Sequence, residues 1–267
     1  MSLFHLFLVA LIQGVTEFLP VSSSGHLVLL PGLTGLEDQG QVIDVAVHVG
    51  TLGAVVLYFW SDVKEALAGS VRLLQGKVDT RGAFLALCLA IGTIPVVLFG
   101  LFLDLTGIDD QLRSITVVGW TTLIFGLFLY WADQRGTTER KAEEWTLKHA
   151  VIMGLWQALA LIPGTSRSGI TITAGRMLGY GRESAARIGM LMSIPTIIAS
   201  GVYLAGEVIA TADAQAARDG AIAASFAFLS ALLALVLMMR LLRSVSFTPY
   251  VIYRVILGVI LLVIAYT

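Results

Sequence analysis

The sequence predicts an all-α integral membrane protein with six transmembrane helices and two re-entrant helical hairpins in an inverted-topology repeat. Three observations support this fold class. First, the 267 residues are 57% hydrophobic and 13% charged, whereas soluble domains are about 45–50% apolar and about 25% charged. Second, six apolar runs are long enough to cross a bilayer. Third, two further apolar runs are interrupted by polar residues and resemble each other.

The six apolar runs have the length of about 20 residues that a transmembrane helix needs. In chain order they are Val42–Trp60, Ala83–Leu103, Ser114–Trp131, Ala185–Ala205, Ala221–Met239 and Pro249–Tyr266. The single cysteine, Cys88, lies in the second run. It excludes an internal disulfide and is expected to be a small buried hydrophobe. The net charge of −1 gives no polybasic segment for nucleic acid.

The two interrupted runs predict helical hairpins rather than spans. The runs and the shorter apolar pieces that follow them are Leu3–Leu19 with Leu27–Leu33, and Trp145–Ile162 with Ile170–Leu178. Gln13, Glu17 and Pro20 interrupt the first run. Gln157 interrupts the second, which continues into "PGTSRSG". Each interrupted run and the short piece after it therefore predict a helix, a polar turn and a short helix that returns to the starting side of the membrane.

The two hairpin regions also indicate an internal repeat. "LIQGVTEFLPVSSSGHL" and "LWQALALIPGTSRSGIT" share a Gln, a Pro and a Ser-Gly that closes a hydroxyl-rich turn. We interpret the chain as one membrane domain, 1–267, built from repeats 1–132 and 133–267. A hairpin does not change sides, but three spans do. The second repeat therefore enters the membrane from the opposite side, as in the inverted repeats of transporters.

The distribution of basic residues supports this topology and orients it. On one predicted side lie Lys64, Arg72, Lys77, Arg81, Arg135, Arg140, Lys141, Lys148, Arg176, Arg182, Arg187, Arg240 and Arg243, and on the other only Arg113 and Arg218. The basic side is expected to be cytoplasmic. Both termini, position 38 and the mouth of the first hairpin are then expected outside, with position 77 inside. Arg167 and Arg254 remain as charges embedded in the membrane.

Hairpins that enter from opposite faces are expected to meet near the membrane midplane, where irregular backbone must be buried or line a wet cavity. The two polar turns would then share one cavity. A charge at this depth costs about 2.5–3.5 kcal/mol even on a lenient scale. Glu17 therefore needs a partner, which could be Arg167, a metal ion or His26. Alternatively, Glu17 ends a helix at the membrane interface. Gln13 shares its helix face.

The first turn holds a candidate nucleophile and base. Ser22, Ser23, Ser24 and Gly25 form a small-residue turn that could simply cap the following helix. His26 follows Ser22 and Ser23 by four and three residues, close enough for an imidazole to take a hydroxyl proton and activate a nucleophile. The alternative is a structural histidine.

The second turn, Pro163–Gly169, predicts an anion site. Its hydroxyls, the N–H groups at a helix start and the planar guanidinium of Arg167 all suit phosphate. Alternatively, Arg167 only pairs with Glu17. The residues expected to bind the substrate are Gly164, Thr165, Ser166, Ser168 and Gly169 here, and Gln13, Ser22, Ser24 and Gly25 in the first hairpin. Asp44 and His48, four residues apart, are either a supporting pair or a helix-end pair. Together these groups favour phosphoryl chemistry on a lipid headgroup.

The motifs also resemble a known family. "QGVTEFLPVSSSGH" (Gln13–His26) and "PGTSRSGIT" (Pro163–Thr171) closely resemble the two signature motifs of the bacterial BacA-type undecaprenyl pyrophosphate phosphatases, and the resemblance covers essentially the whole chain. It implies hydrolysis of undecaprenyl pyrophosphate to the monophosphate, which recycles the carrier lipid for peptidoglycan and other wall polymers. It also implies a link to bacitracin resistance and a bacterial inner-membrane site that opens to the periplasm.

The resemblance implies roles for the residues of the first turn. Ser23 is the expected nucleophile, with Ser22 as the rival and His26 as a competing assignment. In the main assignment His26 is the general base and then the acid. Glu17 either orients His26 or holds a metal, because the family is reported to need Mg²⁺ or Ca²⁺. The family often carries Glu where this chain has Gln13, so two-carboxylate metal binding is not implied here.

Arg167, together with Ser166, Ser168 and backbone N–H groups, is expected to stabilise charge on the transferred phosphoryl group. A second hypothesis is a lipid-phosphate or anion transporter, because inverted repeats with broken helices are a transporter architecture. A structural scaffold would leave the embedded ionisable groups unexplained. The sequence leaves the oligomeric state open, and a homo-oligomer is compatible with it.

Overall fold

The computed structural model describes residues 1–35, 39–211 and 213–267, so position 38 lies outside the described residues. The described part of the chain is helical and holds no β-strand. Its helices are α1 (Leu3–Phe18), α2 (Ser23–Thr34), α3 (Gly40–Tyr58), α4 (Trp60–Leu74), α5 (Arg81–Thr106), α6 (Ile108–Leu112), α7 (Ile115–Arg135), η1 (Ala142–Glu144), α8 (Leu147–Ala158), η2 (Leu159–Leu161), α9 (Arg167–Met177), α10 (Arg182–Thr211), α11 (Ala214–Leu241) and α12 (Thr248–Tyr266).

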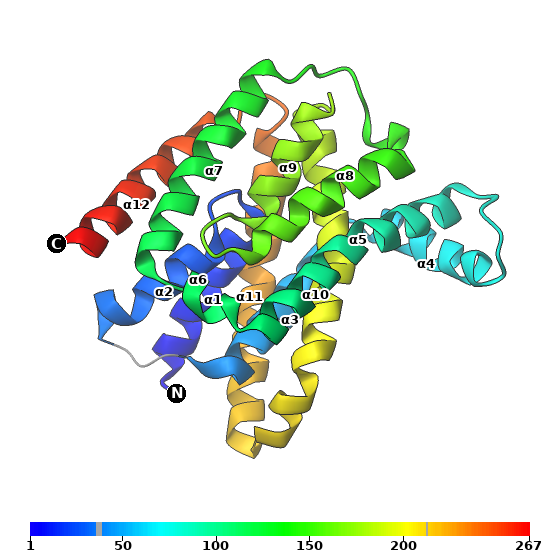
Figure 1. Ribbon diagram of the computed structural model, residues 1–267. Helices are drawn as coiled ribbons and strands as arrows, with labels where there is room; N and C mark the ends of the chain where they lie inside the picture. The colour runs from blue at the N-terminus through cyan, green and yellow to red at the C-terminus, as the bar shows by residue number, and fades with distance from the viewer. Residues whose placement is uncertain (36–38, 212) are drawn as a thin grey trace.

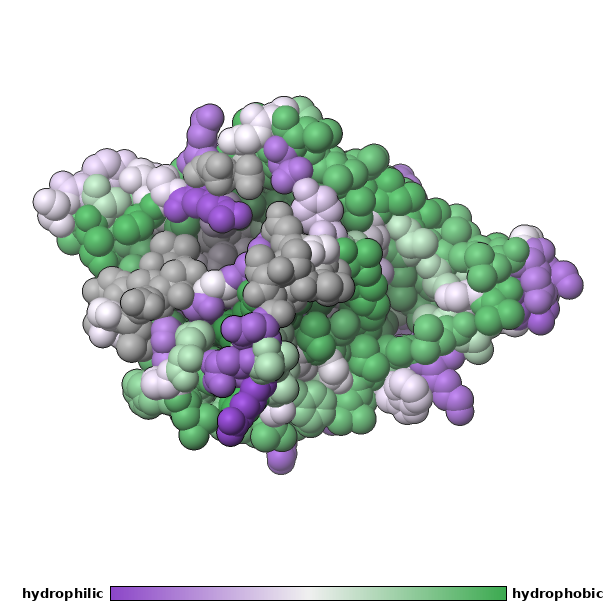
Figure 2. All heavy atoms as spheres, turned by 90° about the horizontal axis from the view of Figure 1, so that it is seen from below, coloured by the Kyte–Doolittle hydropathy of each residue, from purple (hydrophilic) through white to green (hydrophobic). Residues whose placement is uncertain are grey.

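Six described helices are long and apolar enough to cross a membrane: α3, α5, α7, α10, α11 and α12. Each predicted span falls on one of them, so the prediction of an all-α, multi-pass membrane protein is confirmed. Large apolar side chains on these helices face outward, with Leu98 62%, Leu105 84% and Val202 71% exposed. Figure 2 shows the end that carries the N-terminus: hydrophobic residues cover much of the described surface, and hydrophilic residues gather in several separate patches.

The two predicted hairpins form as pairs of short helices. The 16 residues of α1 reach about 24 Å at 1.5 Å per residue, less than the roughly 30 Å hydrocarbon core. Helix α1 ends at Phe18 because Pro20 disfavours helical backbone at the preceding residue. Leu19 is accordingly extended, with ψ 142°. Helices α8 and α9 are likewise separated by a turn, and Figure 1 shows them as the two arms of a hairpin.

The helices of the two hairpins pack on long helices from the other half of the chain. Helix α1 lies along α11, and α8 lies along α5 (Figure 1). Glycines permit these close approaches. A Cβ at Gly14 would fall 1.9 Å from Ser230 Oγ on α11, and one at Gly154 would fall 2.5 Å from the Gly92 carbonyl oxygen on α5. Small residues at such contacts are typical of helix packing in membranes.

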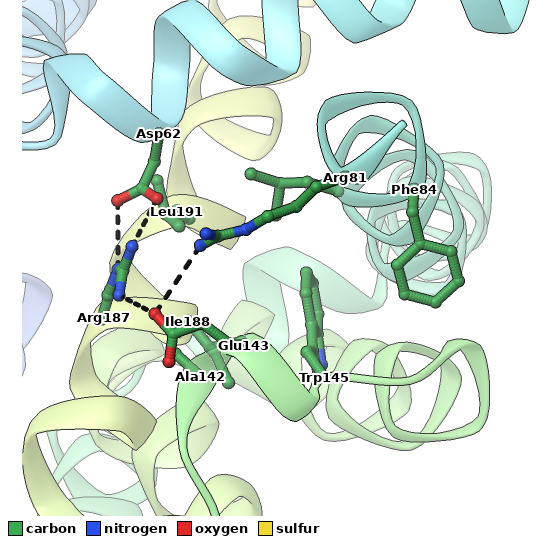
Figure 3. A pocket seen from close by; sticks show the side chains of 10 residues that line it. Asp62, Arg81, Phe84, Ala142, Glu143, Trp145, Arg187, Ile188 and Leu191 are labelled. Atoms are coloured by element: carbon green, nitrogen blue, oxygen red, sulfur yellow. Dashed lines mark hydrogen bonds and ion pairs between the residues drawn. The ribbon is translucent and has the colours of Figure 1, made fainter. Parts of the chain in front are cut away.

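Ion pairs tie the helices together at the predicted basic end. Arg187 on α10 donates to Asp62 on α4 at 3.0 and 2.5 Å, and to Glu143 Oε1 at 2.6 Å. Arg81 lies 3.6 Å from the same Glu143 oxygen. Figure 3 shows these side chains converging on one small pocket. The sequence did not predict α4, because this helix is amphipathic rather than continuously apolar.

Candidate active site

The two polar turns meet inside the helix bundle, as the sequence predicts. Figure 1 shows the α1–α2 turn and the α8–α9 turn close together near the centre of the molecule. Ser168 Oγ donates to the Leu19 carbonyl oxygen at 2.9 Å, and the Gly164 N–H donates to Ser24 Oγ at 3.4 Å. Side chains from both hairpins therefore surround a single site.

The backbones of the two turns have the same geometry. Ser22 and Ser166 each have a positive φ, 73° and 71°, and each directly precedes a helix. Their hydroxyls accept hydrogen bonds from Gly25 N at 3.4 Å and Gly169 N at 3.1 Å. A positive φ at a non-glycine residue costs of order 1–3 kcal/mol and is concentrated at functional sites. The equivalence puts Ser23 and Arg167 at matching first positions of α2 and α9.

The Glu17 carboxylate is the centre of the cluster and is only 8% exposed. It accepts a short, charge-assisted hydrogen bond from Arg167. It also accepts from Gln13 Nε2 at 2.9 Å and from Ser23 Oγ at 3.1 Å. Of the partners considered from the sequence, Arg167 is the one in contact. Because Glu17 is buried, it is not a solvated helix end.

The serines of the first turn differ in their hydrogen-bond partners. Ser23 is partly buried, and its hydroxyl donates to the Glu17 carboxylate. Ser22 is 2% exposed, and its Oγ lies 3.1 Å from Ser24 Oγ while accepting from Gly25 N. Ser23 is thus the serine whose proton already faces a carboxylate, which distinguishes it from its rival Ser22.

His26 does not make the expected contact with a serine hydroxyl among the hydrogen bonds of the described residues. Its Nδ1 lies 2.7 Å from the Ser22 carbonyl oxygen, and its Nε2 lies 2.5 Å from Tyr253 Oη. The physical reason is local: the ring sits one helical turn after Ser22, where the backbone carbonyl captures Nδ1. The expectation that Glu17 orients His26 is also not met, because the carboxylate faces Ser23 and Arg167 instead.

The hydroxyls of the second turn are used mostly within the protein. Ser166 Oγ and Ser168 Oγ lie 3.1 Å apart, and Ser168 donates to Leu19. These two hydroxyls stabilise the turns, so Arg167 and the N–H groups at the start of α9 remain as the stronger anion donors. Thr165 is completely buried, and its Oγ1 has no hydrogen-bond partner among the described residues.

Arg254 is a site residue whose role the sequence does not predict. Arg254 lies on α12, and its side chain is completely buried. The guanidinium donates to the carbonyl oxygens of Gly164 and Thr165, both at 3.0 Å, to Pro20 at 3.4 Å and to Thr122 on α7 at 3.1 Å. It thereby connects both turns to two long helices. The sequence marks Arg254 only as a charged residue within an apolar span. Charged residues in such spans usually face the protein interior and pair with polar groups there.

His48 also reaches the site. Its Nδ1 lies 2.7 Å from the Asp44 carbonyl oxygen, and its Nε2 lies 3.1 Å from Gln13 Nε2 and 3.9 Å from Glu17 Oε2. The spacing of Asp44 and His48 predicted either a supporting pair or a helix-end pair. It did not predict that the His48 imidazole points towards Glu17. Tyr253 carried no such signal, because exposed tyrosines are common in membrane helices.

The donor set around Glu17 fits a divalent cation that also binds substrate oxygens. The described residues hold no group of three or more His, Cys, Asp or Glu side chains arranged for a metal. However, Gln13 Oε1 is buried without a hydrogen-bond partner, one helical turn from the Glu17 carboxylate. Mg²⁺ is commonly bound by one or two carboxylates together with substrate phosphates. One carboxylate and one amide oxygen satisfy that pattern.

Comparison with known proteins gives one consistent result. The family described as "Bacitracin resistance protein BacA" matches residues 6–260. The chain is 76% identical to a protein of Jannaschia sp. (strain CCS1) and 72% identical to one of Ruegeria pomeroyi, over the full length of both chains in each case. It is 44% identical to a protein of Saccharophagus degradans over 97% of this chain and 96% of the relative. All three relatives are named undecaprenyl-diphosphatase. The chain therefore belongs to the BacA family.

Proposed function

We propose that this chain is an undecaprenyl-diphosphatase, a membrane hydrolase that converts undecaprenyl pyrophosphate to undecaprenyl phosphate and inorganic phosphate. The family and the names of its relatives support this activity. The structural observation that carries it is the contact of Ser23, Glu17 and Arg167 within one buried cluster. These side chains provide a nucleophile, a base and a charge clamp for a phosphoryl group.

In the proposed mechanism, Ser23 Oγ attacks the terminal phosphorus while its proton moves to Glu17 Oε2, which it already faces at 3.1 Å. The bond between the terminal phosphorus and the bridging oxygen breaks, and undecaprenyl phosphate leaves with the electron pair. Protonation removes the charge of Glu17. Arg167 then loses its counter-charge at the moment when negative charge builds on the phosphoryl oxygens, and its guanidinium is free to bind them. Water finally hydrolyses the phosphoserine and releases phosphate.

A divalent cation, Mg²⁺ or Ca²⁺, is part of the proposal. Glu17 in its ionised state, before it takes the Ser23 proton, would hold it together with phosphate oxygens of the substrate. Gln13 now faces Glu17 with its Nε2, so its unpartnered amide oxygen would join them after the amide turns. The ion supplies positive charge that neutralises the pyrophosphate.

The proposal includes an orientation and an internal repeat. The basic end is cytoplasmic, both termini are periplasmic, and the site opens to the periplasm of the bacterial inner membrane. There the product recycles the carrier lipid for peptidoglycan synthesis, in a family whose description names bacitracin resistance. The repeats 1–132 and 133–267 are supported by the matching turns at Ser22 and Ser166.

Phosphate release from C55 pyrophosphate by the pure protein in detergent tests the activity. We expect release by the unsubstituted chain and its loss in Ser23→Ala, with substrate binding retained through Arg167. Rapid acid quench followed by mass spectrometry of the Ser22–His26 peptide should find phosphoserine at Ser23. Phosphate on His26 would assign the nucleophile to the imidazole, and activity in Ser23→Ala with none in Ser22→Ala would assign it to Ser22. Transport of a lipid phosphate without phosphate release would favour the transporter alternative.

A further inference from the structure

The hydrogen bonds of His26 fix its tautomer. A carbonyl oxygen can only accept, so the contact of 2.7 Å with the Ser22 oxygen requires Nδ1 to carry the proton. Nε2 of the neutral ring is therefore the acceptor. It accepts a hydrogen bond from the Tyr253 hydroxyl at 2.5 Å. The positive φ of Ser22 belongs to the backbone that presents its carbonyl to the ring.

This arrangement leaves Tyr253 as the group in contact with the basic nitrogen of His26. The two rings lie parallel, with planes 2° apart and centroids separated by 5.5 Å. His26 lies on the same face of α2 as Ser23, one turn later. Tyr253 comes from α12, directly before Arg254, which binds the carbonyls of both turns. The phenol and imidazole therefore form a hydrogen-bonded chain at the edge of the cluster.

We propose that Tyr253 relays protons between His26 and the water that hydrolyses the phosphoserine. This inference rests on the proposed function. Water attacks the phosphorus on Ser23 and gives a proton to Tyr253 Oη, while Tyr253 passes its own proton to His26 Nε2. The bond between phosphorus and Ser23 Oγ breaks, its electron pair stays on the serine oxygen, and the proton held by Glu17 returns there. The imidazolium, stabilised by the Ser22 carbonyl, then releases its proton to the departing phosphate or solvent.

A double-mutant cycle tests the relay, with Tyr253→Phe, His26→Ala and the double variant. Tyr266→Phe is the matched control, because this tyrosine lies on the same helix and its hydroxyl accepts from Trp120 on α7 at 3.3 Å. We expect Tyr253→Phe to lower kcat by about 10²–10³-fold with little change in KM, and to accumulate phosphoserine after acid quench. It should have no further effect in His26→Ala, because both residues act as one unit. Tyr266→Phe should stay within about twofold.

Either of two kinetic results would overturn the relay. The first is unchanged turnover in Tyr253→Phe. The second is an equal loss of kcat in the native and His26→Ala backgrounds, which indicates independent structural effects. Histidine ¹⁵N NMR separates the contact from the chemistry. The Nε2 resonance that disappears in His26→Ala should move in Tyr253→Phe and not in Tyr266→Phe, and an unmoved resonance would overturn the contact itself. If the unsubstituted chain released no phosphate, the proposed function would fail and the relay with it, whereas release unaffected by Tyr253→Phe overturns the relay alone.

Discussion

At the scale of single residues, the buried carboxylate of Glu17 joins the two hairpins chemically. It accepts hydrogen bonds from the Arg167 guanidinium of the second hairpin and from the Ser23 hydroxyl of its own hairpin. An ionised group at this depth is costly, and the guanidinium of Arg167 offsets part of that cost. Because Ser23 donates to the same carboxylate, this contact also holds Arg167 near the proposed nucleophile. The structural and catalytic interpretations of the Glu17–Arg167 pair are therefore compatible, and they differ in what substitution should do.

Glu17→Gln should lower kcat by about 10²–10⁴-fold, the range of a general-base contribution. The amide keeps the shape of the side chain and can still accept from Ser23, but it cannot take the proton. Gln13→Ala removes a neutral side chain from the same helix face and should lower kcat much less. Phosphate release from C55 pyrophosphate measures both variants. A fully active Glu17→Gln protein would show that the carboxylate is only structural.

Gln13→Glu should raise the affinity for a divalent cation, because it replaces the unpartnered amide oxygen with a second carboxylate beside Glu17. Titration of activity with Mg²⁺ or Ca²⁺ after chelator treatment measures the concentration for half-maximal rate. We expect that concentration to fall at least severalfold. Gln157→Glu is the matched control, because Gln157 Oε1 is also buried without a partner but lies in the other hairpin. An equal change in both variants would argue against metal binding at Gln13.

The sequence predicted most residues of the cluster but not all of their contacts. Ser23, Glu17 and Arg167 were found because polar groups stand out in an apolar chain. The hydrogen bond between His26 and a serine hydroxyl did not form, because sequence spacing cannot distinguish a side-chain oxygen from a backbone carbonyl one turn away. Arg254 and Tyr253 lie more than 200 residues from the first turn, and no local pattern links them to it.

At the scale of elements, the two turns depend on one side chain for their relative position. Arg254 donates to carbonyls of both turns and of α7, and the carbonyl oxygens it satisfies are buried with it. A buried polar group that loses its partner costs about 1–3 kcal/mol. The turns themselves are short and strained, so they cannot replace these donors.

Arg254→Met should therefore lower the apparent Tm in detergent by several degrees and abolish phosphate release. Arg254→Lys should recover only part of both, because one ammonium cannot reach three separate segments. Arg243→Met is the control, since the Arg243 side chain is 71% exposed and its carboxylate partner, Glu183, is 3.6 Å away. Thermal unfolding of the three variants and the unsubstituted chain measures the difference. Equal stability of Arg254→Met and the unsubstituted chain would refute this role.

The long elements were predicted more reliably than the short ones. All six spans are predicted from runs of about 20 mostly apolar residues, the length that the thickness of the bilayer requires. Helix α4 has no such signal, because its apolar residues occupy only one face and alternate with charges. The hairpins were predicted from the polar residues and prolines that interrupt two apolar runs, and the structure shows short apolar helices there. Their re-entrant path through the membrane stays a prediction.

At the scale of the whole molecule, charge and packing support the same arrangement. The predicted basic end is where Arg187 and Arg81 pair with Asp62 and Glu143 (Figure 3). At that end Arg176 is also buried against Asp133 at 3.1 Å. Helix α1 packs on α11 as α8 packs on α5, an exchange expected of two halves related by a pseudo-two-fold axis.

Thiol labelling in intact cells tests the orientation and the inverted repeat together. Cys88 is completely buried, so Cys88→Ala gives a background without a thiol and without a newly buried hydroxyl. Single cysteines are introduced at Gln39 and Lys77 in the first repeat, and at Lys141 and Arg218 in the second. An impermeant maleimide added from outside should label positions 39 and 218 and not positions 77 and 141, because the first hairpin opens outward and the second inward. All four sites should react after the membrane is permeabilised, which shows that the thiols are accessible. Labelling of 77 and 141 alone would reverse the orientation, whereas labelling of 39 and 141 together without 77 and 218 would rule out the inverted repeat.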